Sequence, residues 1–338
     1  MSRTILVGDI HGCYAELCAL LDAVALHPDD TLVSVGDLVD RGPQPREVID
    51  LLRGRPNTVV LCGNHERKHV RGLLSFSQQV ARLQLGAGYA DDVAWMGALP
   101  YYYETEVVRA VHFGMFPGVP LAETPQEVLS GTTSGCAILD KRYAGRPWWE
   151  HYEDEVPVSF GHAVMQPGAM VWRDRVYGLD TGACHGHRLT ALILEERRLV
   201  SVPASADHWV AVRRRWEGEV LKTQDWSAMT FEQIAKKAGR RRDPEIDGAW
   251  FERLSAWSAA LAAARPGLVR RLDAELERLR AEHGEEQLGR AAAAHPAASW
   301  LLRHQAGRLS REQGGCTTPS EVQRLAAALG EEVPALRW

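Results

Sequence analysis

The segment GDLVDRG, residues 36–42, decides the fold because two carboxylates, an arginine and two glycines come directly after an apolar, β-branched run at residues 31–35. Such a run is typical of a buried strand, and glycine permits the sharp turn that follows it. Helical spacing then begins, with Val48, Leu51 and Leu52 on one face. Strand, polar turn and helix in this order predict an α/β layered fold.

The same order recurs on both sides of this segment. GDIHG (8–12) follows a predicted strand at 4–7, and GNHE (63–66) follows one at 58–61. His112 follows a predicted strand at 107–111, and His162 follows one at 156–160; further strands are predicted at 176–179 and 191–194. Because ligands of α/β sheets gather at the carboxyl ends of strands, we expect the five polar segments to converge on one crevice.

Six side chains in these segments form a candidate metal-ligand set of carboxylate, imidazole and amide groups without a thiolate: Asp9, His11, Asp37, Asn64, His112 and His162. Such donors suit Mn²⁺, Fe or Zn²⁺ at a catalytic site better than a cysteine-rich structural zinc. Six protein ligands exceed what one catalytic ion with an open position uses. The set therefore predicts two ions, with Asp37 as the bridge between them.

A pair of divalent ions lowers the pKa of a bridging water and holds the oxygens of a phosphoryl group. The leaving oxygen then needs a proton, and His65, next to Asn64, is the candidate general acid. Asp40 is expected to orient its imidazole and raise its pKa. Arg41 is expected to bind a phosphate oxygen through its fork of donors. These roles predict hydrolysis of a phosphate ester or anhydride by metal-activated hydroxide.

Seven of the other histidines lack a position at the end of a predicted strand, and we interpret them as surface or packing residues: His27, His69, His151, His208, His283, His295 and His304. The six cysteines are scattered without a C-x-x-C pair, a pattern that favours reduced thiols.

Composition limits the possible partners of the chain. The 338 residues carry a net charge of −5, so the whole molecule has no excess positive field to collect nucleic acid or an acidic membrane surface. No stretch is apolar enough for a transmembrane helix, and the N-terminus does not resemble a signal peptide. We therefore expect a cytoplasmic protein that does not bind membranes.

The composition changes near residue 205, which predicts two domains at 1–205 and 206–338. β-Branched strands give way to alanine, arginine, glutamate and leucine, and the second part is predicted to be helical. It holds seven of the eleven tryptophans and two basic clusters, at 213–215 and 236–242. These features favour a solvated charged face beside tryptophan core anchors. A nucleic-acid surface and a protein-docking module are the alternatives.

The motifs GDIHG, GDLVDRG, GNHE, VHFG and FGHA resemble those of the calcineurin-like metallophosphoesterases of the phosphoprotein phosphatase group, over about residues 1–200. The resemblance implies a four-layer α/β/β/α sandwich with an additional helical C-terminal region. It implies the same six ligands, a general acid at His65 with Asp40 as its partner, and a phosphate-binding arginine at Arg41. It implies two divalent ions, with Mn²⁺ as the first expectation and Fe, Zn, Co or Ni as alternatives.

Segments 146–149, 179–184 and 189–192 look most like bacterial members of that group, which include diadenosine tetraphosphate hydrolases, serine/threonine phosphatases and an RNA end-repair phosphatase module. Two positions depart from the family pattern: Phe113 replaces a small residue, and Ala163 replaces a hydroxyl residue. Phe113 is expected to narrow the site. Three further arginines are candidates for substrate binding: Arg142, Arg146 and Arg188.

The leading interpretation is a bis(5'-nucleosyl)-tetraphosphatase that hydrolyses diadenosine tetraphosphate. A serine/threonine protein phosphatase needs the same centre and is the alternative. A phosphatase fold kept only as a binding scaffold is the interpretation from another class. The expected partner is a phosphorylated small molecule or a phosphoprotein, and nucleic acid could bind only through the basic C-terminal cluster. The sequence leaves the oligomeric state and the role of the helical region open.

Overall fold

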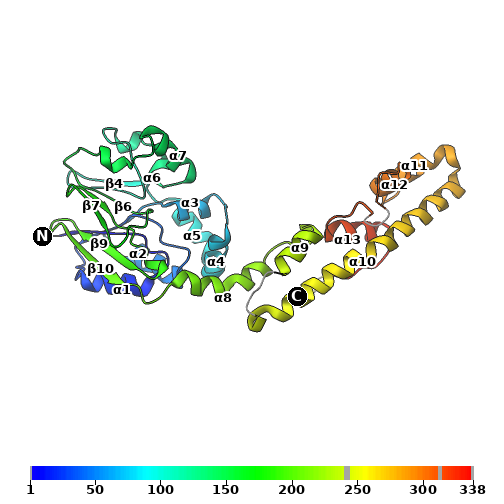
Figure 1. The fold of residues 1–338 in the computed structure, drawn as a ribbon, viewed down its shortest axis with the longest axis horizontal. Coiled ribbons are helices and arrows are strands. Elements are labelled where there is room, and N and C mark those ends of the chain that lie inside the picture. Colours follow the sequence, from blue (N-terminus) through cyan, green and yellow to red (C-terminus); the bar gives the residue numbers. More distant parts are fainter. Residues whose placement is uncertain (1, 240–243, 311–313, 336–338) are drawn as a thin grey trace. The chain divides into compact units, whose positions relative to one another are not determined.

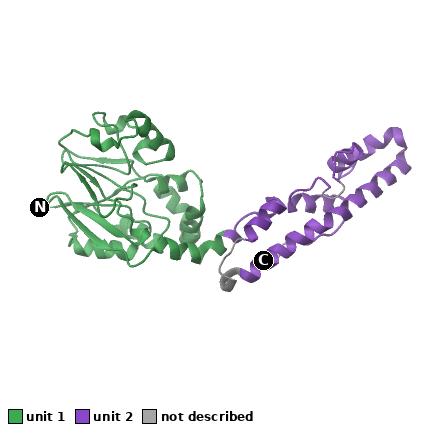
Figure 2. Ribbon diagram, viewed as in Figure 1, with its two compact units in different colours: residues 1–220 green, residues 221–338 purple. Residues whose placement is uncertain are grey.

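The computed structural model describes residues 2–239, 244–310 and 314–335 (Figure 1). The chain forms two compact units, Met1–Val220 and Leu221–Trp338 (Figure 2). The predicted boundary at residue 205 follows the last strand, β10 (Arg198–Pro203). The first unit extends beyond that point through most of helix α8 (His208–Lys222).

The first unit contains two five-stranded sheets. One sheet has the order β10-β9-β1-β2-β3, with β1 parallel to β2 and β2 parallel to β3, whereas β9 runs antiparallel to β1 and β10. The other has the order β4-β5-β6-β8-β7, with β5, β6 and β8 parallel to one another and antiparallel strands at both edges. The strands are β1 (Thr4–Val7), β2 (Thr31–Ser34), β3 (Thr58–Val60), β4 (Tyr102–Glu104), β5 (Arg109–Val111), β6 (Val158–Phe160), β7 (Met170–Trp172), β8 (Val176–Gly178) and β9 (Arg188–Ile193).

Side-chain alternation along the strands builds the layers. In β1, Ile5 and Val7 face a core shared with helices α1 (Tyr14–Ala23) and α2 (Pro45–Gly54), whereas Leu6 faces a second core. That second core joins residues of both sheets, so the sheets pack face to face. Helices α6 (Gln126–Leu129) and α7 (Thr133–Arg142) share a third core with the outer face of the second sheet. The first unit is therefore a four-layer α/β/β/α sandwich, as the resemblance implies.

Seven strands lie where the sequence predicts them. Three strands were not predicted: β4, β7 and β10. All three lie at the edge of a sheet. An edge strand has one neighbour and exposes part of its surface, so it does not need the continuous apolar run that marks a central strand.

The remaining elements of the first unit are mostly helical. Helices α3 (Asn64–Val70), α4 (Phe76–Leu85) and α5 (Tyr89–Met96) follow β3, and α8 packs Val212 and Val220 against Val80 of α4. Short 3₁₀ turns occur at η1 (Gly86–Gly88), η2 (Leu121–Glu123), η3 (Trp148–His151) and η4 (Ala183–His185).

The second unit is helical in its described residues. The 40-residue helix α10 (Pro244–His283) supplies Leu254, Leu261 and Leu272 to a core of its own. Around it lie η5 (Trp226–Ala228), α9 (Phe231–Ala238), η6 (Glu285–Gln287), α11 (Leu288–Ala294), α12 (Ala298–Gln305) and α13 (Pro319–Ala328). Trp226, Trp250 and Trp257 are buried in this core. They are the core anchors that the sequence favours.

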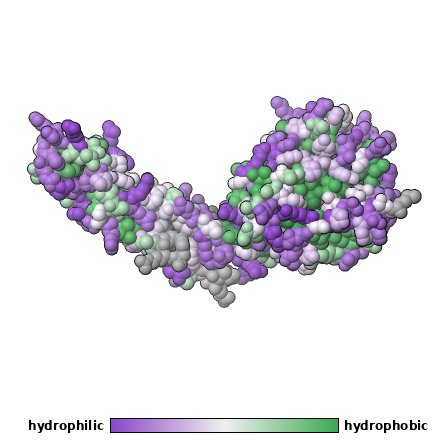
Figure 3. Space-filling view, turned by 180° about the vertical axis from the view of Figure 1, so that it is seen from behind, coloured by the Kyte–Doolittle hydropathy of each residue, from purple (hydrophilic) through white to green (hydrophobic). Residues whose placement is uncertain are grey.

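The surfaces of both units mix hydrophilic and hydrophobic residues in the view of Figure 3. Arg213–Arg215 of the first basic cluster lie on α8, whereas Arg240, Arg241 and Arg242 of the second lie outside the described residues. Among the described helices, none combines the length and the apolar character that crossing a membrane requires.

Candidate active site

The five polar segments meet at the carboxyl ends of β1, β2, β3, β5 and β6. Asp9 and His11 follow β1, and Asp37 through Arg41 follow β2. Asn64 and His65 begin helix α3 directly after β3, while His112 and His162 follow β5 and β6. All of these strands except β3 have neighbours on both sides. The site therefore stands on a framework that spans both sheets.

The backbone of the site is strained. Five of the non-glycine residues with a positive φ belong to the site: His11 (46°), Asp37 (52°), Asp40 (71°), Arg41 (65°) and His162 (64°). The left-handed conformation costs about 1 kcal/mol or more for each such residue and persists only where the surrounding structure enforces it. Such strain gathers at functional sites, and here it falls on the turns that carry the candidate ligands.

Two glycines are required by close contact with the candidate ligands. A Cβ at Gly161 would lie 2.0 Å from Asp9 Oδ1, and a Cβ at Gly63 would lie 2.2 Å from Asp37 Oδ1. Real Cβ atoms do not approach an oxygen so closely, so only glycine lets these turns reach the carboxylates.

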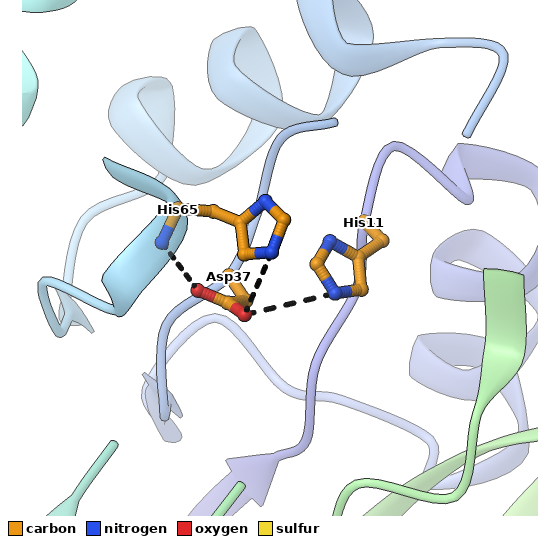
Figure 4. A group of neighbouring side chains, drawn as sticks. All are labelled: His11, Asp37 and His65. Carbon is orange, nitrogen blue, oxygen red and sulfur yellow. Dashed lines mark hydrogen bonds and ion pairs between the residues drawn. The ribbon is translucent and has the colours of Figure 1, made fainter. Parts of the chain in front are cut away.

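One group of donors consists of His11, Asp37 and His65 (Figure 4). Asp37 Oδ2 lies 3.6 Å from Nε2 of His11 and 3.9 Å from Nε2 of His65. Asp37 Oδ1 accepts a hydrogen bond from the backbone N–H of His65 at 3.0 Å. All three residues are buried. They can hold a metal ion, because one donor atom from each lies within 4.8 Å of the others.

A second group consists of Asp37, His112 and His162. Asp37 Oδ1 lies 3.4 Å from Nε2 of His112. Asn64 Oδ1 lies between the two imidazoles, 3.1 Å from His112 Nε2 and 2.9 Å from His162 Nδ1. The two groups share Asp37. A carboxylate in that position can bridge two cations, which is the role that the sequence predicts for it.

Hydrogen bonds to the backbone set the direction of two imidazoles. Nδ1 of His11 lies 2.9 Å from the carbonyl oxygen of Val39, and Nδ1 of His112 lies 2.9 Å from that of Val35. When Nδ1–H donates to these carbonyls, each Nε2 is left with a lone pair that faces Asp37.

Burial favours neutral imidazoles at the site. It lowers the pKa of His11 well below its ordinary value, with help from the Arg41 charge. Burial also lowers the pKa of His112. It lowers the pKa of His162 to about 3, where His112 adds to the effect. A metal-ligating histidine must be neutral, so the protonation of these groups suits a metal site.

Asp9 faces a second carboxylate, Asp180, which lies two residues after the end of β8. Burial, Asp180 and Asp37 together raise the pKa of Asp9 well above its ordinary value. Burial, opposed by the backbone N–H of Gly182, raises the pKa of Asp180 to about 6. The backbone N–H of His162 donates to both oxygens of Asp9 at 3.1 Å. Several buried carboxylates without equal cationic charge are typical of a site for divalent cations.

His65 and Asp40 form a buried hydrogen-bonded pair through His65 Nδ1 and Asp40 Oδ2. Burial alone lowers the pKa of His65, but the charges of Asp37 and Asp40 outweigh it and raise the pKa above its ordinary value. Asp40 also bonds Nε2 of His69 at 3.0 Å through Oδ1, and Gln78 donates to its Oδ2. The carboxylate is therefore held from three sides, and it orients the imidazole of His65.

The side chain of Arg41 contacts the first donor group. Its two terminal nitrogens lie 2.9 Å from His11 Nε2 and 3.1 Å from His65 Nε2. Nε2 of His11 is a donor atom of the first donor group, so an ion bound to His11 requires the guanidinium to leave this contact. The guanidinium keeps its positive charge at all physiological pH values, and its side chain reaches the donor groups, where an anionic substrate would need that charge.

Glu66 ties the turn after β2 to helix α3. Its carboxylate accepts backbone N–H groups of Asp37 at 2.9 Å, Leu38 at 2.8 Å and Gly63 at 3.0 Å. Glu66 is fully buried. Burial and the Asp37 charge raise its pKa to about 7. The residue holds Asp37 in place without facing the donor groups itself.

The three other arginines predicted to bind substrate have their contacts with residues outside the two donor groups. Arg142 is exposed and stacks over the ring of Phe116, with its guanidinium carbon 4.4 Å from the ring centroid. Arg146 pairs with Glu150, and Arg188 is exposed with a contact to the Ser201 carbonyl. Their role in substrate binding stays a prediction. Phe113 packs against the imidazole of His162, with centroids 4.6 Å apart.

The structure adds four residues that sequence reasoning missed or left without a role. His69, interpreted as a surface or packing residue, is buried and bonds Asp40; its spacing of four from His65 on one helix could have indicated this. Glu66 is the N3 residue of a capping box. Asp180 follows a predicted strand as the other site residues do. Gln78 has no comparable signal in the sequence.

Comparison with known proteins identifies relatives over the first unit. The family model for calcineurin-like phosphoesterases matches residues 2–190. A bis(5'-nucleosyl)-tetraphosphatase PrpE (asymmetrical) of Geobacillus thermodenitrificans is 30% identical over 240 residues, which cover 60% of this chain and 95% of that protein. A symmetrical bis(5'-nucleosyl)-tetraphosphatase of Pectobacterium atrosepticum is 27% identical over 267 residues, with 60% of this chain and 95% of that protein covered.

A solved structure shows the same fold. Its description gives diadenosine tetraphosphatase as a provisional assignment. The two chains are 28% identical with a TM-score of 0.50, and the match covers 60% of this chain and 94% of that one. Because the family model spans more than half of the chain, this protein belongs to the calcineurin-like phosphoesterase family and is a hydrolase.

Proposed function

We propose that the protein is a bis(5'-nucleosyl)-tetraphosphatase that uses two divalent ions, most readily Mn²⁺, to hydrolyse diadenosine tetraphosphate. The observation that carries the proposal is the pair of donor groups that share Asp37, with Arg41 in contact with His11 and His65 of the first group. Relatives that carry this activity in their names, both asymmetrical and symmetrical, support the choice of substrate.

The donor chemistry fits two divalent ions. One ion would be held by Asp9, His11 and Asp37, and the other by Asp37, Asn64, His112 and His162. Carboxylate, imidazole and amide donors without a thiolate favour Mn²⁺, Fe or Zn²⁺. When bound, such a pair supplies Lewis acidity toward a phosphoryl group and lowers the pKa of water.

The protein's own residues perform the remaining tasks. Arg41, freed from its contacts with His11 and His65, binds a non-bridging phosphate oxygen through two parallel N–H groups. His65 holds a proton at Nε2 for the leaving oxygen, because Asp40 engages Nδ1 and stabilises the charged imidazole. Glu66 and the strained turn after β2 keep Asp37 and Asp40 in fixed positions.

The proposal is tested by incubating the purified, Mn²⁺-loaded protein with diadenosine tetraphosphate and resolving the products by ion-exchange chromatography. ADP alone indicates symmetrical cleavage, and ATP with AMP indicates asymmetrical cleavage. A phosphoserine peptide at the same concentration is the competing substrate. Faster release of phosphate from the peptide, with the dinucleotide left intact, would replace the proposal with a protein phosphatase.

A further inference from the structure

A pocket of about 610 Å³ opens beside the second donor group. Asn64 and His162 of that group are among its lining residues. Lys68, Arg71 and the segment Thr132–Ser134 line its sides. A volume of this size accommodates a molecule as large as a nucleotide. A substrate whose scissile phosphorus lies at the donor groups can therefore extend into this pocket.

Cationic side chains of helix α3 and its C-cap line the pocket. Lys68 is four residues beyond Asn64 on the helix, and Arg71, seven residues beyond Asn64, is the C-cap of the helix; this spacing places all three on one side. With a rise of about 1.5 Å per residue, Lys68 lies about 6 Å and Arg71 about 10 Å along the axis from the candidate ligand. The pocket thus presents positive charge at increasing distance from the donor groups.

The cations differ in how far their charge is already neutralised. Arg67 is buried and pairs with Glu127, and Arg71 lies 3.5 Å from the same carboxylate. Lys68 is half-buried, and within the described residues its side chain makes no hydrogen bond or ion pair. A half-buried ammonium without a carboxylate partner favours an external anion.

The wall formed by the start of helix α7 is also suited to an anion. Thr132, Thr133 and Ser134 line it with hydroxyl groups, and the Thr132 hydroxyl accepts the Gly135 N–H as the cap of helix α7. Hydroxyl groups can donate to phosphate oxygens, and neither this wall nor α3 places a carboxylate in the pocket lining.

We propose that this pocket binds the phosphate chain that continues beyond the scissile phosphoryl group, and that Lys68 is the residue that selects phosphoanhydride chains over single phosphate groups. The inference rests on the proposed function and deepens it, because a dinucleoside polyphosphate has such a chain and a phosphoserine does not. Arg71 contributes less than Lys68, since Glu127 already offsets part of its charge.

The test is calorimetric binding of tripolyphosphate and of orthophosphate to the Mn²⁺-loaded full chain, at constant free Mn²⁺. Lys68→Ala is expected to weaken tripolyphosphate binding about tenfold, as for the loss of one charge-assisted contact that is partly exposed. Orthophosphate binding should change by less than about twofold. Lys68→Arg should restore tripolyphosphate binding, and Lys141→Ala, which removes an exposed cation at the far end of α7, should have no effect.

Unchanged tripolyphosphate affinity in Lys68→Ala, or an equal loss for both anions, would overturn the assignment. So would a larger loss for an acidic phosphopeptide than for tripolyphosphate, because the pocket would then serve a peptide. Lys68-dependent binding of tripolyphosphate together with no cleavage of diadenosine tetraphosphate would leave the pocket assignment in place and reject the proposed function.

Discussion

Replacing Asp40 with asparagine tests the assignment of His65 as the general acid. The Asp40 carboxylate is fully buried and accepts hydrogen bonds from His65, His69 and Gln78. An asparagine amide has the shape of the Asp40 carboxylate, but one of its two acceptor oxygens is replaced by an NH₂ donor. It also lacks the negative charge that stabilises protonated His65. The imidazole then loses both its orientation and part of its affinity for the proton.

The magnitude follows from the bond that is lost. A hydrogen bond to a charged group contributes about 1.5–3 kcal/mol, which corresponds to a factor of about 10–150 in rate. The full loss applies only where the leaving oxygen needs a proton. We expect kcat for phenyl phosphate to fall by about that factor, and kcat for 2,4-dinitrophenyl phosphate to fall by no more than about threefold.

The assay is kcat across a series of aryl phosphates of increasing leaving-group pKa, at saturating Mn²⁺. Asp92→Asn is the matched control, since Asp92 is also buried and charged but pairs with Arg46. His65→Ala should show the same dependence on the leaving group, and adding Asp40→Asn to it should change little. Equal losses for every leaving group in Asp40→Asn would refute the reasoning, because the residue would then act on the fold or on metal binding alone.

Three further outcomes are expected. Asp37→Asn should abolish turnover and lower the bound Mn²⁺ from two ions to at most one per chain by mass spectrometry of the metal, and chelator treatment of the wild type should be reversed by added Mn²⁺. Glu66→Gln turns one acceptor of three backbone N–H groups into a donor, so chemical denaturation should show a loss of about 3 kcal/mol, with weaker Mn²⁺ binding. Hydrogen bonds from Arg3 and the His27 N–H hold the pKa of Asp30 far below its ordinary value, although burial alone would raise it. Asp30→Asn should therefore cost about 1–2 kcal/mol at pH 7. The difference from wild type should begin to shrink as the pH falls below about 4 and should vanish only below the lowered pKa of folded Asp30, since the group stabilises the fold only while it is ionised there; a difference that does not decrease between about pH 4 and pH 2 would contradict this.

The central strands and their polar turns could be predicted from the sequence because both signals are local. A β-branched run followed by Gly-Asp specifies a strand and a turn within ten residues, as at 31–37. The edge strands β4, β7 and β10 escaped because partial exposure relaxes the apolar pattern that the prediction needs. The described part of the second unit is helical, as its composition predicts, but its function stays open.

The sequence by itself determined which residue types stand at the strand ends, and hence the class of chemistry, since carboxylate, imidazole and amide donors imply a cation whatever surrounds them. Only the tertiary structure decided how those groups are supported. Asp40 lies between His65, His69 and Gln78, Asp180 faces Asp9, and the pocket runs along Lys68. Most of these contacts join elements far apart in the chain, so their distances depend on how two sheets and their helices pack, which no local pattern encodes.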